Sequence, residues 1–298
     1  MNVKHCMLGV MLIFMSMVAA CSEHGLVLWH AYSGDERTAL EQSVARYNQR
    51  HPEAPLLAVA VPYAGMADKL ASAIPHGNGP DIFIYPHDRL GDWVSAGTIE
   101  PIEFWLDDSV LQRFEPAALA AMVERGSLWA LPVAVKTEAM FYRKDRFATP
   151  PQTLAQLHMQ TASASPRGEY PLGYVNADLY GHAPFLHAFG GRALDDHDQL
   201  AIDSAAAVHA AQFARELVTN HTVPQNLDGP GMASLFNNGK VYAVFSGPWF
   251  VADITPGLDW GIAPMPSIDV DGKATALQPY LGADALVMSS RAHNKAAA

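Results

Sequence analysis

In residues 26–85, LVLWHAYSGDERTALEQSVARYNQRHPEAPLLAVAVPYAGMADKLASAIPHGNGPDIFIY, short apolar runs alternate with stretches of helical periodicity. The apolar runs predict strands at 26–29, 56–61 and 81–85. Between them, Leu40, Val44 and Tyr47 mark one face of a first helix, and Met66, Leu70 and Ile74 mark one face of a second. The order strand-helix-strand-helix-strand is typical of the α/β class, in which helices cover an open sheet.

The carboxyl ends of these predicted strands are the first place to look for a ligand site. In open α/β sheets, ligands bind in the crevice beyond the strand ends. Trp29 and His30 end the first strand, and Tyr85 with the run 86–89 (PHDR) ends the third. We therefore expect these residues to lie on the binding edge.

The later part of the chain carries a second set of strand and helix signals. Extended segments are predicted at 127–131 and 133–142, with Pro132 between them, and an Ala-rich helix at 204–220. A short helix at 232–238 precedes a buried strand at 241–245, and Ser246-Gly247-Pro248-Trp249 begins another helix with proline in its first turn. Strands follow at 260–263 and 286–289.

Composition limits the possible functions. The chain has 298 residues, which suits one large or two ordinary domains, and 50% are hydrophobic, which excludes wholesale disorder. The formal net charge of −11 argues against binding to nucleic-acid phosphates. Motifs for nucleotide, metal and nucleophile sites are missing, so we expect no cofactor, no metal and no catalytic residue.

The N-terminus predicts export. Residues 1–20 have the features of a signal peptide: Lys4, then the apolar run 6–18, then two small residues. Val18-Ala19-Ala20-Cys21 resembles a bacterial lipobox, which predicts lipidation of Cys21 and a location in the periplasm or anchored in the cell envelope. The alternative is an ordinary secretory signal in which Cys21 has no role. No later run reaches eighteen apolar residues, so we expect no membrane span.

Five segments in order carry a family resemblance. The chain resembles the maltose/maltodextrin-binding proteins, which are family 1 extracellular solute-binding proteins of ABC sugar importers. The segments are 26–34 (LVLWHAYSG), 79–89 (GPDIFIYPHDR), 130–145 (ALPVAVKTEAMFYRKD), 236–240 (FNNGK) and 246–249 (SGPW).

The resemblance implies a fold of the periplasmic-binding-protein kind, with two type II-like α/β lobes, a ligand cleft and a hinge. Lobe 1 would comprise 22–134 plus 283–298, and lobe 2 would comprise 139–280, with hinge crossings at 134–138 and 280–283. The match ends near Asn294-Lys295. It therefore implies a C-terminally truncated chain, in which lobe 1 is incomplete and lobe 2 lacks its C-terminal helices.

The resemblance also implies the binding residues. Trp29 falls where the family has an aromatic residue beside the sugar, and Trp249 falls where a second-lobe tryptophan stacks on a pyranose face. Tyr180 lines up with a second-lobe tyrosine. Asp88 and Arg89 fall where a carboxylate and a guanidinium bind hydroxyls, and Tyr85 replaces an aromatic residue just upstream of them. Asp178 lines up with an acidic residue two before that tyrosine, and Lys136 stands where the maltose branch has a glutamate. The other candidates are Asp68, which aligns near a family glutamate, and Tyr32 in the loop after the first strand.

These residue types suit a neutral sugar without reference to a family. Aromatic rings cover its C–H faces, and planar charged groups fix its hydroxyls. Structural roles stay open for the same residues. Trp29 could be a core residue, Asp88 and Arg89 a surface pair or a helix cap, and Tyr180 a cover for the core.

We therefore predict a solute-binding protein that captures a carbohydrate, with a maltodextrin-like oligosaccharide as the first expectation, and delivers it to ABC importer permease subunits. It would be a monomer that binds no nucleic acid and catalyses no reaction. The alternatives are a glycan-hydrolysing lipoprotein and a solute-binding protein for another ligand, such as glycerol phosphate.

Overall fold

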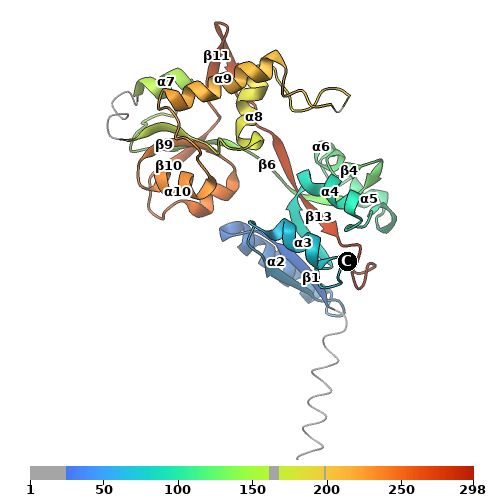
Figure 1. The fold of residues 1–298 in the computed structure, drawn as a ribbon. Helices are drawn as coiled ribbons and strands as arrows, with labels where there is room; N and C mark the ends of the chain where they lie inside the picture. The colour runs from blue at the N-terminus through green and yellow to red at the C-terminus, as the bar shows by residue number, and fades with distance from the viewer. Residues whose placement is uncertain (1–24, 161–167, 198) are drawn as a thin grey trace, which may run out of the picture. The chain divides into compact units, whose positions relative to one another are not determined.

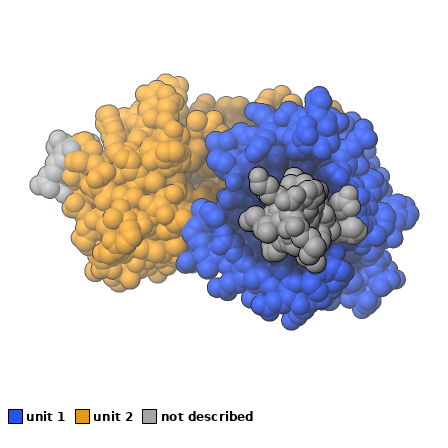
Figure 2. All heavy atoms as spheres, turned by 90° about the horizontal axis from the view of Figure 1, so that it is seen from below, with its two compact units in different colours: residues 1–135, 282–298 blue, residues 136–281 orange. Residues whose placement is uncertain are grey.

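The computed structural model describes residues 25–160, 168–197 and 199–298. The predicted signal peptide and Cys21 therefore lie outside the described residues. The chain divides into two compact units, which Figure 2 colours separately: unit 1 is residues 1–135 with 282–298, and unit 2 is 136–281. Within the described part of the chain, no helix combines the length and the apolar character needed to cross a membrane.

Unit 1 is built on a five-stranded sheet with the order β2-β1-β3-β13-β6. β1 (Leu26–His30) pairs in parallel with β2 (Leu56–Ala60) and with β3 (Ile82–Pro86), as the alternating pattern predicts. β13 (Leu281–Met288) runs antiparallel to β3, so the second segment of unit 1 completes the sheet that the first segment begins. β6 (Ala130–Thr137) is the last strand in the order.

β6 differs from the sequence prediction. Pro132 was expected to separate two extended segments, but the strand continues through it. Proline has no N–H to donate to a ladder, and it is tolerated where one side of the strand has no partner. The terminal position of β6 in the sheet order supplies such a side.

Helices and short strands of unit 1 pack on this sheet around one core. This core contains Phe83 and Met66, which are both fully buried, together with Trp93. The helical elements are α2 (Gly34–Arg50), α3 (Met66–Ala73), η1 (His87–Arg89), α4 (Leu90–Ala96), η2 (Glu103–Trp105), α5 (Asp108–Leu111) and α6 (Pro116–Ala120). A small hairpin of β4 (Val123–Glu124) and β5 (Ser127–Leu128) completes the unit.

Unit 2 contains a four-stranded sheet with the order β10-β7-β9-β8. These strands are β7 (Ala139–Arg143), β8 (Tyr170–Gly173), β9 (Val241–Ser246) and β10 (Trp260–Ala263). Successive side chains of a strand point to opposite faces. Accordingly Phe245 belongs to one apolar cluster and its neighbour Val244 to another, so both faces of the sheet are covered.

Different helices supply the two covers. Phe185 and Leu217 belong to the first cluster, and Met232, Phe236 and Phe250 belong to the second. Figure 1 shows α9 and α10 on opposite sides of this sheet. The helical elements are α7 (Leu154–Gln160), α8 (Leu179–Ala188), α9 (Ala205–Thr219), α10 (Gly229–Asn237) and η4 (Pro248–Asp253), and β11 (Ser267–Val270) forms a hairpin with β12 (Lys273–Ala276).

Candidate functional site

Three aromatic side chains gather in unit 2. The ring centroid of Tyr180 lies 6.3 Å from that of Trp249 and 6.1 Å from that of Tyr280. Trp249 is 38% exposed, and Tyr180 and Tyr280 are half-buried. We call these three residues the aromatic cluster. Two of them, Tyr180 and Trp249, were predicted from the sequence, whereas Tyr280 was not.

The backbone at the end of β9 positions Trp249. Every residue of β9 is buried, and Gly247 follows directly, before Pro248 opens η4. A Cβ atom on Gly247 would overlap the six-membered part of the Trp249 indole. Glycine allows this close approach, because the ring lies back over the turn and a side chain at 247 would force the indole to move.

The start of α8 positions Tyr180. Asp178 is the N-cap, and its Oδ1 accepts a hydrogen bond from the Gly181 amide at 2.8 Å. A Cβ atom on Gly181 would overlap the Val175 carbonyl oxygen, so the first turn is fixed by both residues. Asp178, which the sequence predicts to be a ligand contact, thus caps α8. Its side chain is nevertheless exposed.

A buried carboxyl group lies near the aromatic cluster. Glu138 is 8% exposed, and its Oε2 has no hydrogen-bond partner among the residues that the structure describes. Burial, and secondarily the nearby Asp178 carboxylate, raise the pKa of Glu138 to about 7. Glu138 is not among the residues predicted from the sequence. The half-buried Lys136, which is among them, lies two residues earlier, at the end of β6.

Two contacts hold Tyr280 in the aromatic cluster. Thr137 donates its hydroxyl hydrogen to the Tyr280 carbonyl oxygen at 3.1 Å, across 143 residues of sequence. The His187 and Tyr280 rings are nearly perpendicular, with 4.8 Å between centroids, and His187 Nδ1 lies 2.6 Å from the Gln278 carbonyl oxygen. Only the folded chain brings these segments together, which explains why no local pattern indicated Tyr280.

In unit 1, the predicted residues at the ends of β1 lie mostly inside the protein. Trp29 is 8% exposed in the core, and the Lys69 ammonium covers its ring at 4.4 Å. Tyr32 donates its hydroxyl hydrogen to Asp284 Oδ2 at 2.7 Å. Burial is the main cause that raises the pKa of Tyr32, and the Asp284 carboxylate adds to it.

At the end of β3, Tyr85 is buried and stacks on Tyr63 at 5.3 Å between ring centroids. The exposed Arg89 donates to Asp92 at 3.1 Å, so part of its hydrogen-bonding capacity is used within its own helical turn. Asp88 beside it and Asp68 in the first turn of α3 are exposed. Tyr63, on the loop after β2, was not predicted.

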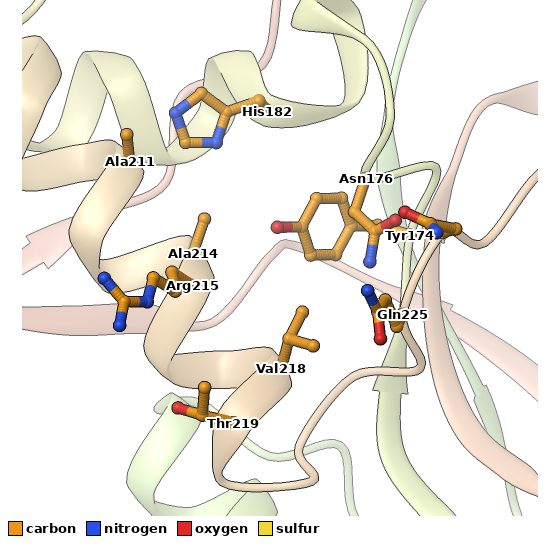
Figure 3. A pocket seen from close by; sticks show the side chains of 10 residues that line it. Tyr174, Asn176, His182, Ala211, Ala214, Arg215, Val218, Thr219 and Gln225 are labelled. Atoms are coloured by element: carbon orange, nitrogen blue, oxygen red, sulfur yellow. The ribbon is translucent and has the colours of Figure 1, made fainter.

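A separate cavity of about 520 Å³ opens in unit 2 between α8, α9 and the loop that contains Gln225. The Tyr174 hydroxyl points into it, and His182, whose pKa burial lowers, lies at its border (Figure 3). Its lining residues include none of the predicted site residues that the structure describes. We therefore assign the candidate site to the aromatic cluster.

Among the described residues, no three His, Cys, Asp or Glu side chains are arranged to hold a metal ion. What the candidate site offers is ring faces and carboxyl groups. Rings of this kind cover apolar C–H surfaces, and carboxyl oxygens accept hydrogen bonds from hydroxyl groups. The arrangement is suited to binding a polyhydroxylated ligand.

Comparison with known proteins places this fold in a family. The family model for the bacterial extracellular solute-binding protein matches residues 42–298. The chain is 32% identical over 285 residues to the maltotriose-binding protein of Pyrococcus abyssi, an alignment that covers 94% of this chain and 62% of the relative. It is 26% identical to the galactooligosaccharide-binding protein of Bacillus subtilis, with 91% and 66% covered.

A solved structure agrees with the sequence relatives. The maltotriose-binding protein of Thermus thermophilus, bound with maltotriose, superposes with a TM-score of 0.78 at 25% identity, covering 91% of this chain and 74% of that chain. The fold and site thus define a two-unit α/β binding protein. The chain belongs to the family of bacterial extracellular solute-binding proteins. It spans 62% and 66% of the length of the two curated relatives.

Proposed function

We propose that this protein binds an oligosaccharide of the maltodextrin type outside the cytoplasm and delivers it to the permease of an ABC importer. The aromatic cluster is the single observation that supports this most. Its three rings come from three separate segments and leave the Trp249 indole 38% exposed, where packing alone would favour burial.

The ligand class follows from the chemistry of the cluster. A glucose unit presents C–H groups on its faces and hydroxyls around its rim, and Trp and Tyr rings match those faces. The relatives named above as binding maltotriose or galactooligosaccharide support the same class. A phosphate ligand such as glycerol phosphate would instead favour clustered arginine and lysine.

Titration with neutral oligosaccharides tests this function. Maltotriose, maltotetraose and a galactooligosaccharide would be added to the purified protein while tryptophan emission is recorded. We expect a saturable change for at least one of them, because Trp249 would leave water on binding. Glycerol phosphate in the same assay tests the other ligand class. Absence of saturation with every sugar would refute the carbohydrate assignment.

The same samples separate a binder from a glycan hydrolase. Chromatography after prolonged incubation should recover each oligosaccharide intact if the protein only binds it. Accumulation of shorter sugars, with the rate proportional to protein concentration, would support the hydrolase alternative instead. Size-exclusion chromatography with light scattering tests the proposed monomer.

We further propose that the protein is exported and anchored by lipid at Cys21. The basis is the sequence Val18-Ala19-Ala20-Cys21 after an apolar run of signal-peptide length. Substitution Cys21→Ser should move the protein from the membrane fraction to the soluble fraction, since a thioether-linked lipid needs the cysteine sulfur. Membrane association that survives the substitution would refute lipidation.

A further inference from the structure

Glu138 lies where the three segments of the aromatic cluster converge. Its neighbour Ala139 pairs with Ser246 at the end of β9, three residues before Trp249. On the other side, Thr137 donates to the carbonyl oxygen of Tyr280. The negative charge of Asp178, two residues before Tyr180, acts on the Glu138 carboxyl group. The chain neighbours of Glu138 are thus connected to the segments that carry Trp249 and Tyr280, and Glu138 itself interacts electrostatically with the start of the helix that carries Tyr180.

The carboxyl group of Glu138 has unused hydrogen-bonding capacity. Its Oε2 is buried and has no partner within the described part of the chain, the one side-chain atom there with that property. A buried polar atom without a partner costs about 1–3 kcal/mol of stability. Buried polar atoms in native proteins nearly always have a hydrogen-bond partner, so one without a protein partner calls for an explanation, and a ligand atom can supply it.

We propose that Glu138 is a further sugar-binding residue of unit 2, whose carboxylate accepts a hydrogen bond from a hydroxyl group of the bound oligosaccharide. This inference rests on the proposed carbohydrate-binding function and adds a residue to it. The aromatic rings stack on the faces of the sugar and do not distinguish the positions of its hydroxyl groups. A hydrogen bond from one hydroxyl to Glu138 would therefore fix the orientation of the sugar.

The position also couples sugar binding to a proton. In the free protein the pKa of Glu138 is raised to about 7. A hydroxyl that donates to the carboxylate stabilises the charged form, so binding lowers this pKa and releases a proton. The direction of the pH dependence follows from this. Sugar affinity is highest above the pKa that Glu138 has in the free protein, and it falls as the pH drops through that pKa.

Other titratable groups near Glu138 must be separated from it. Asp178 faces it from the start of α8, Lys136 precedes it at the end of β6, and the phenols of Tyr180 and Tyr280 belong to the aromatic cluster. A further titratable side chain, His187, contacts Tyr280. Its contribution is therefore measured with its own variant.

Isothermal titration calorimetry with maltotriose, a neutral ligand, provides the test. We expect the affinity of the wild-type protein to fall by about five- to tenfold from pH 8 to pH 5.5, for a pKa lowered by about one unit on binding. Near pH 6.5, enthalpies in buffers of different ionisation enthalpy should reveal release of about half a proton per ligand.

Three variants decide the assignment. Glu138→Gln should remove both the proton release and the pH dependence, whereas Glu216→Gln, an exposed glutamate of α9, should retain them. His187→Gln should also retain them. Proton release that persists in Glu138→Gln, or disappears in His187→Gln instead, would overturn the proposal. If the wild-type protein binds sugar without pH dependence, only the role of Glu138 is refuted. If it binds no sugar at any pH, the proposed carbohydrate-binding function itself is refuted.

Discussion

The two units differ in how some of their candidate residues interact with the protein. In unit 1 three of the predicted side chains have these protein contacts: Tyr32 donates to Asp284, Arg89 donates to Asp92, and Lys69 covers Trp29. Asp68 and Asp88 of the same unit are exposed. In unit 2 the Trp249 ring is partly exposed and the Glu138 Oε2 has no partner within the described residues. The two features that support the proposed site, a partly exposed ring and a buried oxygen without a described protein partner, therefore both belong to unit 2.

The largest expected effect concerns the stability of unit 2. The folded-state pKa of Glu138 is about 7 against an ordinary 4.5, so the unfolded chain loses this proton first and stability falls as the pH rises between those values. Glu138→Gln should therefore raise the free energy of unfolding at pH 8 by up to about 3 kcal/mol, at about 1.4 kcal/mol per pKa unit. Urea unfolding measures it.

The same unfolding measurement at low pH serves as the control. Near pH 4.5 the wild-type carboxyl group is protonated in the folded protein, so the variant should show little advantage there. A variant that is destabilised at pH 8 would mean that Glu138 has a protein partner in solution, and the contrast between the units would then disappear.

The next effect concerns binding. Trp249→Ala should weaken oligosaccharide affinity by about tenfold or more, since a stacked aromatic ring contributes both buried area and a specific contact. Trp105→Ala in unit 1 is the matched control, because Trp105 is also an exposed tryptophan, at 48%. Equal affinities for the two variants, measured calorimetrically, would place Trp249 outside the site.

A smaller effect is expected in unit 1. Tyr32→Phe removes the hydroxyl that donates to the buried Asp284, which should lower the free energy of unfolding by about 1 kcal/mol. Sugar affinity should change less than in Trp249→Ala. A larger loss of affinity than of stability would mean that Tyr32 contacts the ligand directly, as the family resemblance implies.

The smallest effect is expected for the ion pair of unit 1. Arg89 and Asp92 are both more than half exposed, and such pairs contribute about 0.2–1 kcal/mol. Asp92→Asn should leave stability almost unchanged. If Arg89 binds sugar, the same variant should alter affinity by freeing the guanidinium, and calorimetry with maltotriose would detect this.

Much of the fold could be predicted because its signals are local. The apolar run 26–29 became β1, and the Gly-Pro turn before Trp249 opens a short helix as expected. The α/β class follows from such alternation alone. Pro132 was the exception. Whether a proline interrupts a strand depends on the position of that strand in its sheet, and a local sequence pattern does not reveal that position.

The candidate site was harder to predict because its contacts are distant in sequence. Tyr32 meets Asp284 across 252 residues, and Thr137 meets Tyr280 across 143. Glu138 gave no signal, because its significance is the missing partner of one oxygen atom rather than its residue type. Trp249 was predictable since the turn that carries it is itself a local motif. The sugar roles of all these residues stay predictions.

The fully buried strand β9 has a consequence for how Trp249 would meet a ligand. Amide hydrogens of such a strand exchange with solvent only when much of the surrounding unit opens. The backbone at the start of the turn that follows β9 is therefore held in place. The backbone that carries the Trp249 ring is thus fixed by the packing of unit 2 itself. Capture of a sugar then costs little backbone entropy at this position.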